Sequence, residues 1–331
     1  MPFSSDPETL SREGVTAEAI GLVRSDPSKP GWTRRRCGTG FTYKDVRGQT
    51  LKGTRAERCR ALVLPPAWDE IWICPHPRGH IQATGRDEAG RLQYRYHPTW
   101  SAARNSAKFD DLIAFGHALP ELRRRVRHDL TYSDCPRALR LAAIVRLLDR
   151  GALRIGRSGR KTYGAVSLRK SHVQIDGHKI VCAYKGKGGT PRRVIVKDKL
   201  LAKTLDGLMA ERGAFLFRSR KVRPAAQDVN AYIQETLGLS FTAKDFRTWK
   251  GSVAAVDALT KAEDITIKAI TQAAANVLGN TPAIAKSSYI HPVLLDLARD
   301  KCRPHQVCDE AESLAGEDLL LAVLEAVQPL A

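Results

Sequence analysis

The sequence predicts an α+β protein. A small N-terminal antiparallel β domain is expected in residues 1–97, and a larger, mainly α domain with an inserted β-hairpin sheet in residues 98–331. Three observations predict this division. Short β-favouring runs fill the first part, apolar residues recur at helical spacing in most of the second part, and a hairpin turn interrupts the helical pattern. A chain of 331 residues fits two domains, because domains usually hold about 100–200 residues.

The N-terminal domain is expected to begin with a polar lead-in over residues 1–30, followed by strands up to residue 97. Short runs rich in β-branched and aromatic residues, separated by Gly and Pro, are typical of strands. The predicted strands are residues 41–43, 61–64, 71–74, 79–86 and 90–96. The last two would form a hairpin around Asp87-Glu88-Ala89.

The second domain is expected to start with helices over residues 101–156, where apolar residues such as Leu141, Ile144 and Leu148 follow helical spacing. A β-ribbon is expected next, because Asp176-Gly177 is a strong signal for a two-residue hairpin turn. Its predicted strands are residues 172–175, 179–184 and 192–196. From residue 198 onward the pattern is mostly helical.

The charge balance predicts a polyanionic partner. Lys and Arg number 54 against 35 acidic residues, a formal net charge of +19. Such an excess favours nucleic acid over an anionic membrane. No apolar stretch approaches the roughly 20 residues that span a bilayer, and the first residues do not form a secretion signal. Seven singly spaced Cys residues are typical of reduced thiols, so a cytoplasmic protein is expected.

Motifs for nucleotide or metal chemistry are missing from the sequence. Residues 185–189 are rich in Lys and Gly but lie between predicted strands, whereas a phosphate-binding loop joins a strand to a helix. No D-x-D cluster is present that would hold magnesium. Cys302, His305 and Cys308 form only a weak zinc pattern, because a fourth ligand is lacking nearby. We therefore expect neither a cofactor nor a metal.

Metal-free cleavage of a phosphodiester needs a nucleophile, donors for the non-bridging oxygens and an acid for the leaving alkoxide. Tyr suits the nucleophile because the phosphate ester that it forms can be reversed. Arg suits the oxygens because its guanidinium stays charged and donates two hydrogen bonds. Lys suits the acid because neighbouring cations lower its pKa.

Four blocks of the sequence carry these residue types in a fixed order. Arg154 lies in Gly-Ala-Leu-Arg-Ile-Gly, Lys187 follows Gly in the predicted ribbon, and Arg247 ends the K-x-x-R pattern that Lys244 begins. Asn280 follows Leu-Gly, and Tyr289 comes nine positions later. Together the blocks resemble the type IB DNA topoisomerases of the small bacterial and poxvirus kind, over roughly residues 31–330.

The resemblance implies that Tyr289 attacks a backbone phosphorus, forms a 3′-phosphotyrosyl link and releases a 5′-hydroxyl strand. It implies that Arg154, Arg247 and Asn280 stabilise the transition state, and that Lys187 protonates the leaving oxygen. It also implies a monomer whose two domains close as a C-shaped clamp around double-stranded DNA. Supercoils would then relax without ATP or a metal, because the covalent link conserves the bond energy.

Several residues leave alternatives open. Lys185 is a near neighbour of Lys187, and a slip of two residues in a hairpin keeps the same face. Lys244 would be either a DNA contact or a second acid. Asn280 departs from the family, which usually has His there, and its amide donates a neutral hydrogen bond that cannot titrate. The Arg runs 34–36 and 123–125 are expected to be solvated faces that could also contact phosphates.

Two other functions account for part of the sequence. A tyrosine site-specific recombinase shares the same site residues. The strand-rich N-terminal region, Lys244 at the usual His position of recombinases and the residues after Arg154 count against it. A non-catalytic basic DNA-binding protein would explain the charge but leave the four ordered blocks as coincidence.

Overall fold

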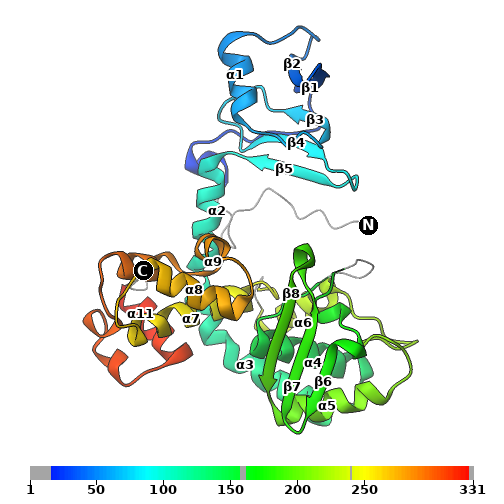
Figure 1. The fold of residues 1–331 in the computed structure, drawn as a ribbon, viewed down its shortest axis with the longest axis vertical. Helices are drawn as coiled ribbons and strands as arrows, with labels where there is room; N and C mark the ends of the chain where they lie inside the picture. Colours follow the sequence, from blue (N-terminus) through cyan, green and yellow to red (C-terminus); the bar gives the residue numbers. More distant parts are fainter. Residues whose placement is uncertain (1–15, 157–161, 239–240, 328–331) are drawn as a thin grey trace. The chain divides into compact units, whose positions relative to one another are not determined.

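The computed structural model of the protein describes residues 16–156, 162–238 and 241–327 (Figure 1). The chain divides into two compact units, residues 1–108 and residues 109–331. The division falls inside helix α2 (Pro98–Asp110). The predicted domain boundary, between residues 97 and 98, lies at the start of the same helix.

The first unit is built on an antiparallel sheet with the strand order β2-β1-β3-β4-β5. Its elements are the short 3₁₀ helix η1 (Glu18–Ile20), β1 (Trp32–Cys37), β2 (Gly40–Lys44), α1 (Gly53–Ala61), β3 (Asp69–Ile73), β4 (Ile81–Arg86) and β5 (Leu92–Tyr96). Trp32, Tyr43 and Ile73 pack with Cys59 of α1 into a core of their own. The predicted antiparallel β domain and its hairpin of β4 and β5 are therefore confirmed.

The predicted strand over residues 61–64 is wrong. Ala61 ends helix α1, and Val63 adopts a left-handed φ of 48° with its side chain exposed. Pro65 and Pro66 follow directly, and proline has no backbone N–H to donate to a sheet. Of the apolar run, Leu64 is buried in the core next to α1, and Leu62 packs against this core while partly exposed.

The second unit combines helices with a sheet of order β6-β7-β8. Its strands are β6 (Val173–Asp176), β7 (Lys179–Lys185) and β8 (Pro191–Lys197). Its helices are α3 (Leu112–Tyr132), α4 (Pro136–Gly151), α5 (Lys199–Ala210), α6 (Ala226–Leu237), α7 (Asp245–Lys261), α8 (Ile267–Leu278), α9 (Pro282–Tyr289), α10 (Pro292–Arg299) and α11 (Gly316–Val327). Short 3₁₀ turns are η2 (Ala165–Ser167), η3 (Lys170–His172), η4 (Lys187–Gly189), η5 (Pro304–Gln306) and η6 (Asp309–Glu312).

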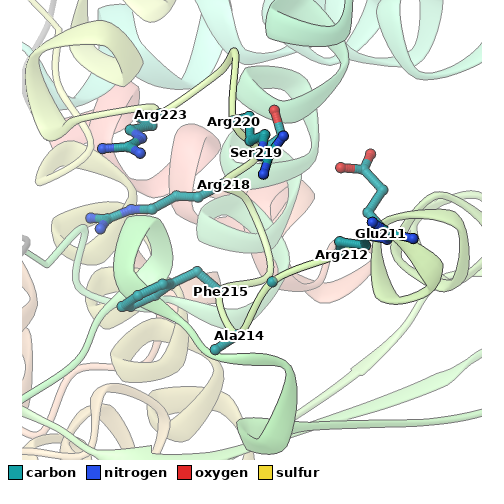
Figure 2. Close-up of a pocket in the computed structure, with 9 residues that line it drawn as sticks. Glu211, Arg212, Ala214, Phe215, Arg218, Ser219, Arg220 and Arg223 are labelled. Carbon is teal, nitrogen blue, oxygen red and sulfur yellow. The ribbon is translucent and has the colours of Figure 1, made fainter.

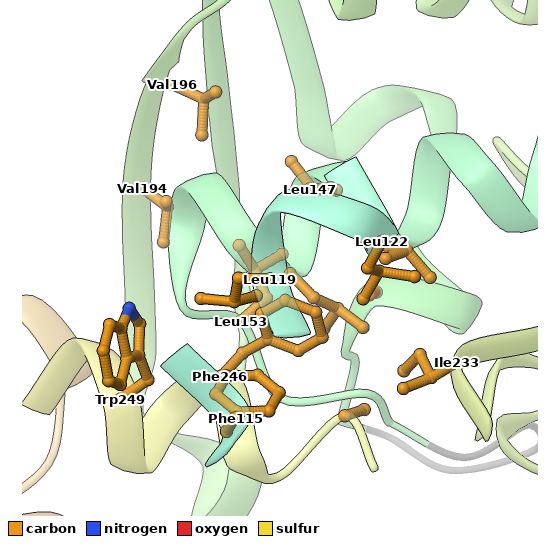
Figure 3. Packing of buried hydrophobic residues seen from close by; sticks show 14 of the residues in the cluster. Phe115, Leu119, Leu122, Leu147, Leu153, Val194, Val196, Ile233, Phe246 and Trp249 are labelled. Carbon is orange, nitrogen blue, oxygen red and sulfur yellow. The ribbon is translucent and has the colours of Figure 1, made fainter. Parts of the chain in front are cut away.

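The inserted sheet packs on α4 and α5, as Figure 1 shows for the green strands. Val194 and Val196 of β8 are buried and face the core, while the residues between them are exposed (Figure 3). In the β6–β7 hairpin Asp176 pairs with Lys179, so the connecting residues are Gly177 and His178, one position later than predicted. Gly177 has a left-handed φ of 57°, which glycine adopts readily.

The helices of the second unit share one large core, and Ala152, Leu278 and Tyr289 form a small separate cluster. Phe115 of α3 contacts the rings of Phe246 and Trp249 of α7 edge-on, with centroids 5.3 and 6.1 Å apart (Figure 3). Leu147 and Leu148 of α4 are fully buried in the same cluster. The core thereby holds the C-terminal end of α4 and the start of α7 in fixed positions.

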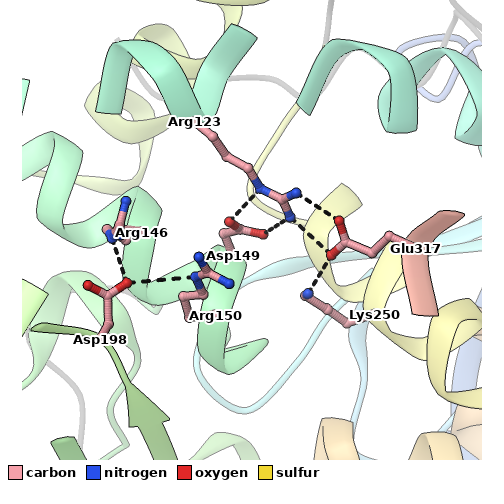
Figure 4. A network of polar contacts seen from close by, with 7 residues as sticks. All are labelled: Arg123, Arg146, Asp149, Arg150, Asp198, Lys250 and Glu317. Atoms are coloured by element: carbon pink, nitrogen blue, oxygen red, sulfur yellow. Dashed lines mark hydrogen bonds and ion pairs between the residues drawn. The ribbon is translucent and has the colours of Figure 1, made fainter. Parts of the chain in front are cut away.

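An ion network links four helices of the second unit and corrects the expectation for Arg123, the first residue of the run 123–125 (Figure 4). Arg123 of α3 donates to both oxygens of Asp149 on α4, at 2.7 and 2.9 Å, and to Glu317 on α11. Lys250 of α7 also contacts Glu317, at 2.6 Å. Arg123 is thus not a solvated charge, because its guanidinium is bound between two carboxylates.

Two structural findings bear on ligands and membranes. Within the described ranges, no three His, Cys, Asp or Glu side chains are grouped as ligands for a metal ion, and this includes Cys302, His305 and Cys308. The helices of the described ranges are all too short or too polar to cross a membrane.

Candidate active site

Each of the four sequence blocks contributes a residue to the wall of one small cavity in the second unit. The fourth block does so through Gly279, while Asn280 and Tyr289 are not among the lining residues. The cavity is lined by Arg154, Tyr163, Tyr184, Gly186, Lys187, Thr190, Arg192, Arg247 and Gly279. Four of these side chains are cations, and none of these lining residues is an acid. Such a lining suits an anion that carries several oxygen acceptors, such as a phosphodiester.

Arg154 reaches the cavity from the segment that follows α4. Ala152 ends the helix in a left-handed conformation, φ 49°, and turns the chain toward the cavity. The carbonyl of Arg154 accepts a hydrogen bond from the N–H of Ala165, at 2.9 Å, which holds the backbone. The Arg154 side chain donates from Nη1 to the hydroxyl oxygen of Tyr289, at 3.1 Å.

Arg247 lies in the first turn of α7 and is 3% exposed. Its guanidinium donates to the carbonyls of Ala152 and Leu278 and lies 4.8 Å from the centroid of the Tyr289 ring. It therefore ties together the ends of α4 and α8 and the tyrosine. Burial lowers the pKa of Arg247 from the usual range of a guanidinium, which lies far above neutral pH.

Tyr289 is the last residue of α9 and is 7% exposed. Its backbone approaches α7 closely, because a Cβ at Gly251 would lie only 2.4 Å from the Tyr289 carbonyl oxygen. Burial raises the pKa of the Tyr289 hydroxyl. The charges of Arg247 and Arg154 and their hydrogen bonds outweigh burial, so the pKa falls below its ordinary value of 10.0. The two guanidinium groups thus make the Tyr289 hydroxyl easier to deprotonate than that of an ordinary tyrosine.

Three lysines were candidates for the acid, and the structure places them differently. Lys187 begins the turn η4 between β7 and β8 and lines the cavity. Lys185 is exposed at the end of β7, and Lys244 is exposed at the start of α7; neither is among the residues that line the cavity.

Asn280 lies in the turn between α8 and α9, directly after the cavity-lining Gly279. Both Nδ2 and Oδ1 of its amide are buried, and neither has a hydrogen-bond partner in the described structure. Buried polar groups are usually paired, so a ligand is the natural partner for this amide.

Arg192 lines the cavity but was not predicted. It lies opposite Tyr184 in the β7–β8 register, and Tyr184 is buried on the cavity side. The alternation of β8, in which Val194 and Val196 point inward, was a signal that Arg192 points inward as well. This alternation is easily overlooked in the sequence, because two adjacent arginines on a ribbon are usually both solvated.

A second hollow in this unit is lined by the loop between α5 and α6 (Figure 2). Arg212, Arg218, Arg220 and Arg223 contribute cations to it. The guanidinium of Arg218 lies 4.6 Å from the centroid of Phe215. The single acidic residue of the lining, Glu211, is bound to Arg140, so the hollow carries a positive charge.

Comparisons with known proteins agree with these findings. The family described as "Eukaryotic DNA topoisomerase I, catalytic core" matches residues 97–293, and "Bacterial DNA topoisomerase IB, N-terminal domain" matches residues 40–87. The DNA topoisomerase 1B of Acanthamoeba polyphaga mimivirus is 30% identical over 289 residues, which cover 80% of this chain and 86% of the relative. The DNA topoisomerase I of monkeypox virus and the DNA topoisomerase 1B of vaccinia virus are each 25% identical over 255 residues, 72% of this chain and 77% of the relatives.

Proposed function

Because this chain belongs to the family of type IB DNA topoisomerases, we propose that it relaxes supercoiled DNA by transient cleavage and rejoining of one strand. The observation that carries the proposal is the hydrogen bond to the Tyr289 hydroxyl from Arg154, one of the four cations that line the cavity. Family membership also argues against a site-specific recombinase. A non-catalytic DNA-binding protein would have no use for a buried tyrosine surrounded by arginines.

In the proposed reaction, the hydroxyl oxygen of Tyr289 attacks a backbone phosphorus. The phenolic proton passes to water, and a bond from Tyr289 to phosphorus forms. The bond from phosphorus to the 5′-oxygen breaks, and this oxygen takes up a proton to become a hydroxyl. The strand with the free 5′-hydroxyl then rotates, and its hydroxyl reverses the reaction. The 3′-phosphotyrosyl link conserves the bond energy, so the reaction balances without ATP.

The other side chains would act on charge and protons. Arg154, Arg247 and Asn280 would stabilise the negative charge that builds on the non-bridging oxygens. Lys187 would donate a proton to the leaving 5′-oxygen. Its place on the cavity wall favours it over Lys185 and Lys244, which leaves Lys244 as a candidate DNA contact.

The substrate would be double-stranded DNA, bound chiefly through its phosphates. The net charge of +19 supplies the attraction, and the arginine-lined hollow between α5 and α6 is a candidate contact outside the reaction site. A monomer that closes around DNA as a clamp, and a cytoplasmic location, stay predictions of the family resemblance.

The test is an incubation with supercoiled plasmid in the presence of EDTA and without ATP. We expect both positive and negative supercoils to relax. Tyr289→Phe should abolish relaxation, because no nucleophile remains, but should leave DNA binding intact in a gel-shift assay. A strict requirement for magnesium or ATP, or a covalent DNA adduct in the Phe variant, would contradict the proposed mechanism.

A further inference from the structure

Arg192 stands out among the cavity residues because neither the sequence blocks nor the proposed reaction accounts for it. It projects from β8 on the same face as the buried Val194 and Val196, and it lines the cavity with Arg154 and Lys187. Its neighbour Arg193 is exposed and pairs with Ala183 on the opposite face of the ribbon. Two adjacent arginines therefore have different surroundings.

The Arg192 side chain extends from the ribbon to the turn that carries Asn280. Nη2 lies 3.4 Å from the carbonyl oxygen of Val277, a long hydrogen bond near the end of α8. A Cβ on Gly279 would lie 1.3 Å from Nη1 of Arg192, so the guanidinium occupies the space of a side chain at position 279. Gly279 has a φ of 55°, which also favours glycine there.

The charged groups around Arg192 indicate what it could bind. No carboxylate is among the described residues that line the cavity of Arg192, and the cations of Arg154, Lys187 and Arg247 share it. Like charges in one cavity repel each other unless an anion joins them. Arg123, by comparison, is neutralised by two carboxylates.

We propose that Arg192 is a further catalytic residue, whose guanidinium contacts a non-bridging oxygen of the phosphodiester held in the cavity. The inference rests on the proposed strand cleavage and extends it. Because Arg192 also touches the turn at Gly279, it would hold the hairpin of Lys187 next to Asn280 while the phosphate is bound.

The experiment measures single-turnover cleavage of one DNA duplex by wild type, Arg192→Ala, Arg192→Lys and the matched control Arg193→Ala. Arg192→Ala should cleave about 100-fold more slowly, as expected for loss of one preorganised donor to a developing oxyanion. Arg192→Lys should recover part of the rate, because it keeps the charge but loses the second donor of the fork. The cleavage rate of Arg193→Ala should stay within about twofold of wild type. The DNA affinity of Arg192→Ala is measured in a Tyr289→Phe background, and it should change little because one contact among many is lost.

A second substrate separates a phosphate contact from a structural role. When a neutral methylphosphonate replaces the scissile phosphate, the charge that Arg192 would bind is absent. The ratio of wild-type to Arg192→Ala rates should then shrink from about 100 toward one, as expected when the stabilised charge is removed. An Arg192→Ala rate equal to that of Arg193→Ala, or an unchanged ratio on the methylphosphonate, would overturn the assignment. If wild type itself forms no covalent adduct, the proposed cleavage reaction fails instead.

Discussion

Replacing Asn280 by Ala should change activity and stability in opposite directions. Both polar atoms of the Asn280 amide are buried and without a partner in the described structure. A buried polar group that lacks a hydrogen bond costs about 1–3 kcal/mol of folding free energy. If the bound phosphate is the missing partner, the free protein carries this cost for the benefit of catalysis.

The magnitude follows from these contacts. Removing the amide relieves the unpaired atoms but leaves a small void, so we expect Asn280→Ala to gain roughly 1 kcal/mol in the free energy of unfolding. For a unit of this size that is a rise in Tm of about 2–4 °C. A hydrogen bond to a charged oxygen contributes about 1.5–3 kcal/mol, so cleavage should slow by roughly 10- to 150-fold.

Asn280→His tests the same contact in the other direction. An imidazole keeps a donor and can carry a charge, and hydrogen bonds from charged donors are roughly twice as strong as neutral ones. We expect the His variant to cleave as fast as wild type or up to about tenfold faster, which corresponds to ~1.4 kcal/mol. Only the part of the bond that strengthens in the transition state accelerates the reaction.

The assay combines thermal unfolding of the free protein with single-turnover cleavage of one duplex. Asn276→Ala is a matched control, because Asn276 is exposed on α8 and bonded only to Gln272 among the described residues. An Asn280→Ala variant that cleaves as fast as wild type would show that the amide does not contact the phosphate. A variant that unfolds at a lower temperature would show that the amide is already satisfied in the free protein.

Four further predictions concern the nucleophile, the acid, the ion network and the DNA surface. Arg247 and Arg154 hold the pKa of Tyr289 below its ordinary 10.0, so the cleavage rate should rise with pH and level off below pH 10. In a pH–rate profile, Arg154→Gln should move the inflection to higher pH, because one of the two cations is lost. Lys187→Ala should slow cleavage of normal DNA strongly, but a 5′-bridging sulfur should largely restore it because a thiolate leaves without a proton; absence of rescue would point to Lys185 or another acid. Burial raises the pKa of Glu317, yet Arg123 and Lys250 lower it from 4.5 to about 2, so this carboxylate stabilises the fold above its ordinary pKa and loses that contribution as pH falls through about 2. Glu317→Gln should therefore lose about 3 kcal/mol in urea unfolding at neutral pH, with the difference closing between pH 4.5 and 2, whereas the exposed Glu312→Gln should lose little. DNA affinity should fall on the order of a thousandfold between 50 and 200 mM salt if about six phosphates are contacted, and a flat response in a binding titration would show that the basic surface is not used.

Local patterns in the sequence determined much of the fold. Alternating apolar residues and the Asp176-Gly177 signal predicted the ribbon of β6, β7 and β8, and helical spacing predicted α3 and α4, because these patterns depend on neighbours within a few positions. The apolar run at residues 61–64 misled, since Ala61 ends helix α1 and Val63 turns the chain with a left-handed φ of 48°.

The sequence also predicted which residue types would form a site, through four ordered blocks and their resemblance to a family. It could not place them in space. Arg154 and Tyr289 lie 135 positions apart and meet at 3.1 Å. Arg247 helps to hold them there, because it binds carbonyls at the ends of α4 and α8 and lies against the Tyr289 ring.

Only the tertiary structure showed which arginines of the basic runs are buried or paired and which are exposed to solvent. Arg123 and Arg124 are neighbours in one basic run, yet Arg123 is bound between Asp149 and Glu317 while Arg124 is exposed on the surface. Arg192 and Arg193 differ in the same way, because one points into the cavity and the other into solvent. A charge on a helix or strand gives no local sign of its partner, since that partner comes from a distant segment and is fixed only when the core packs.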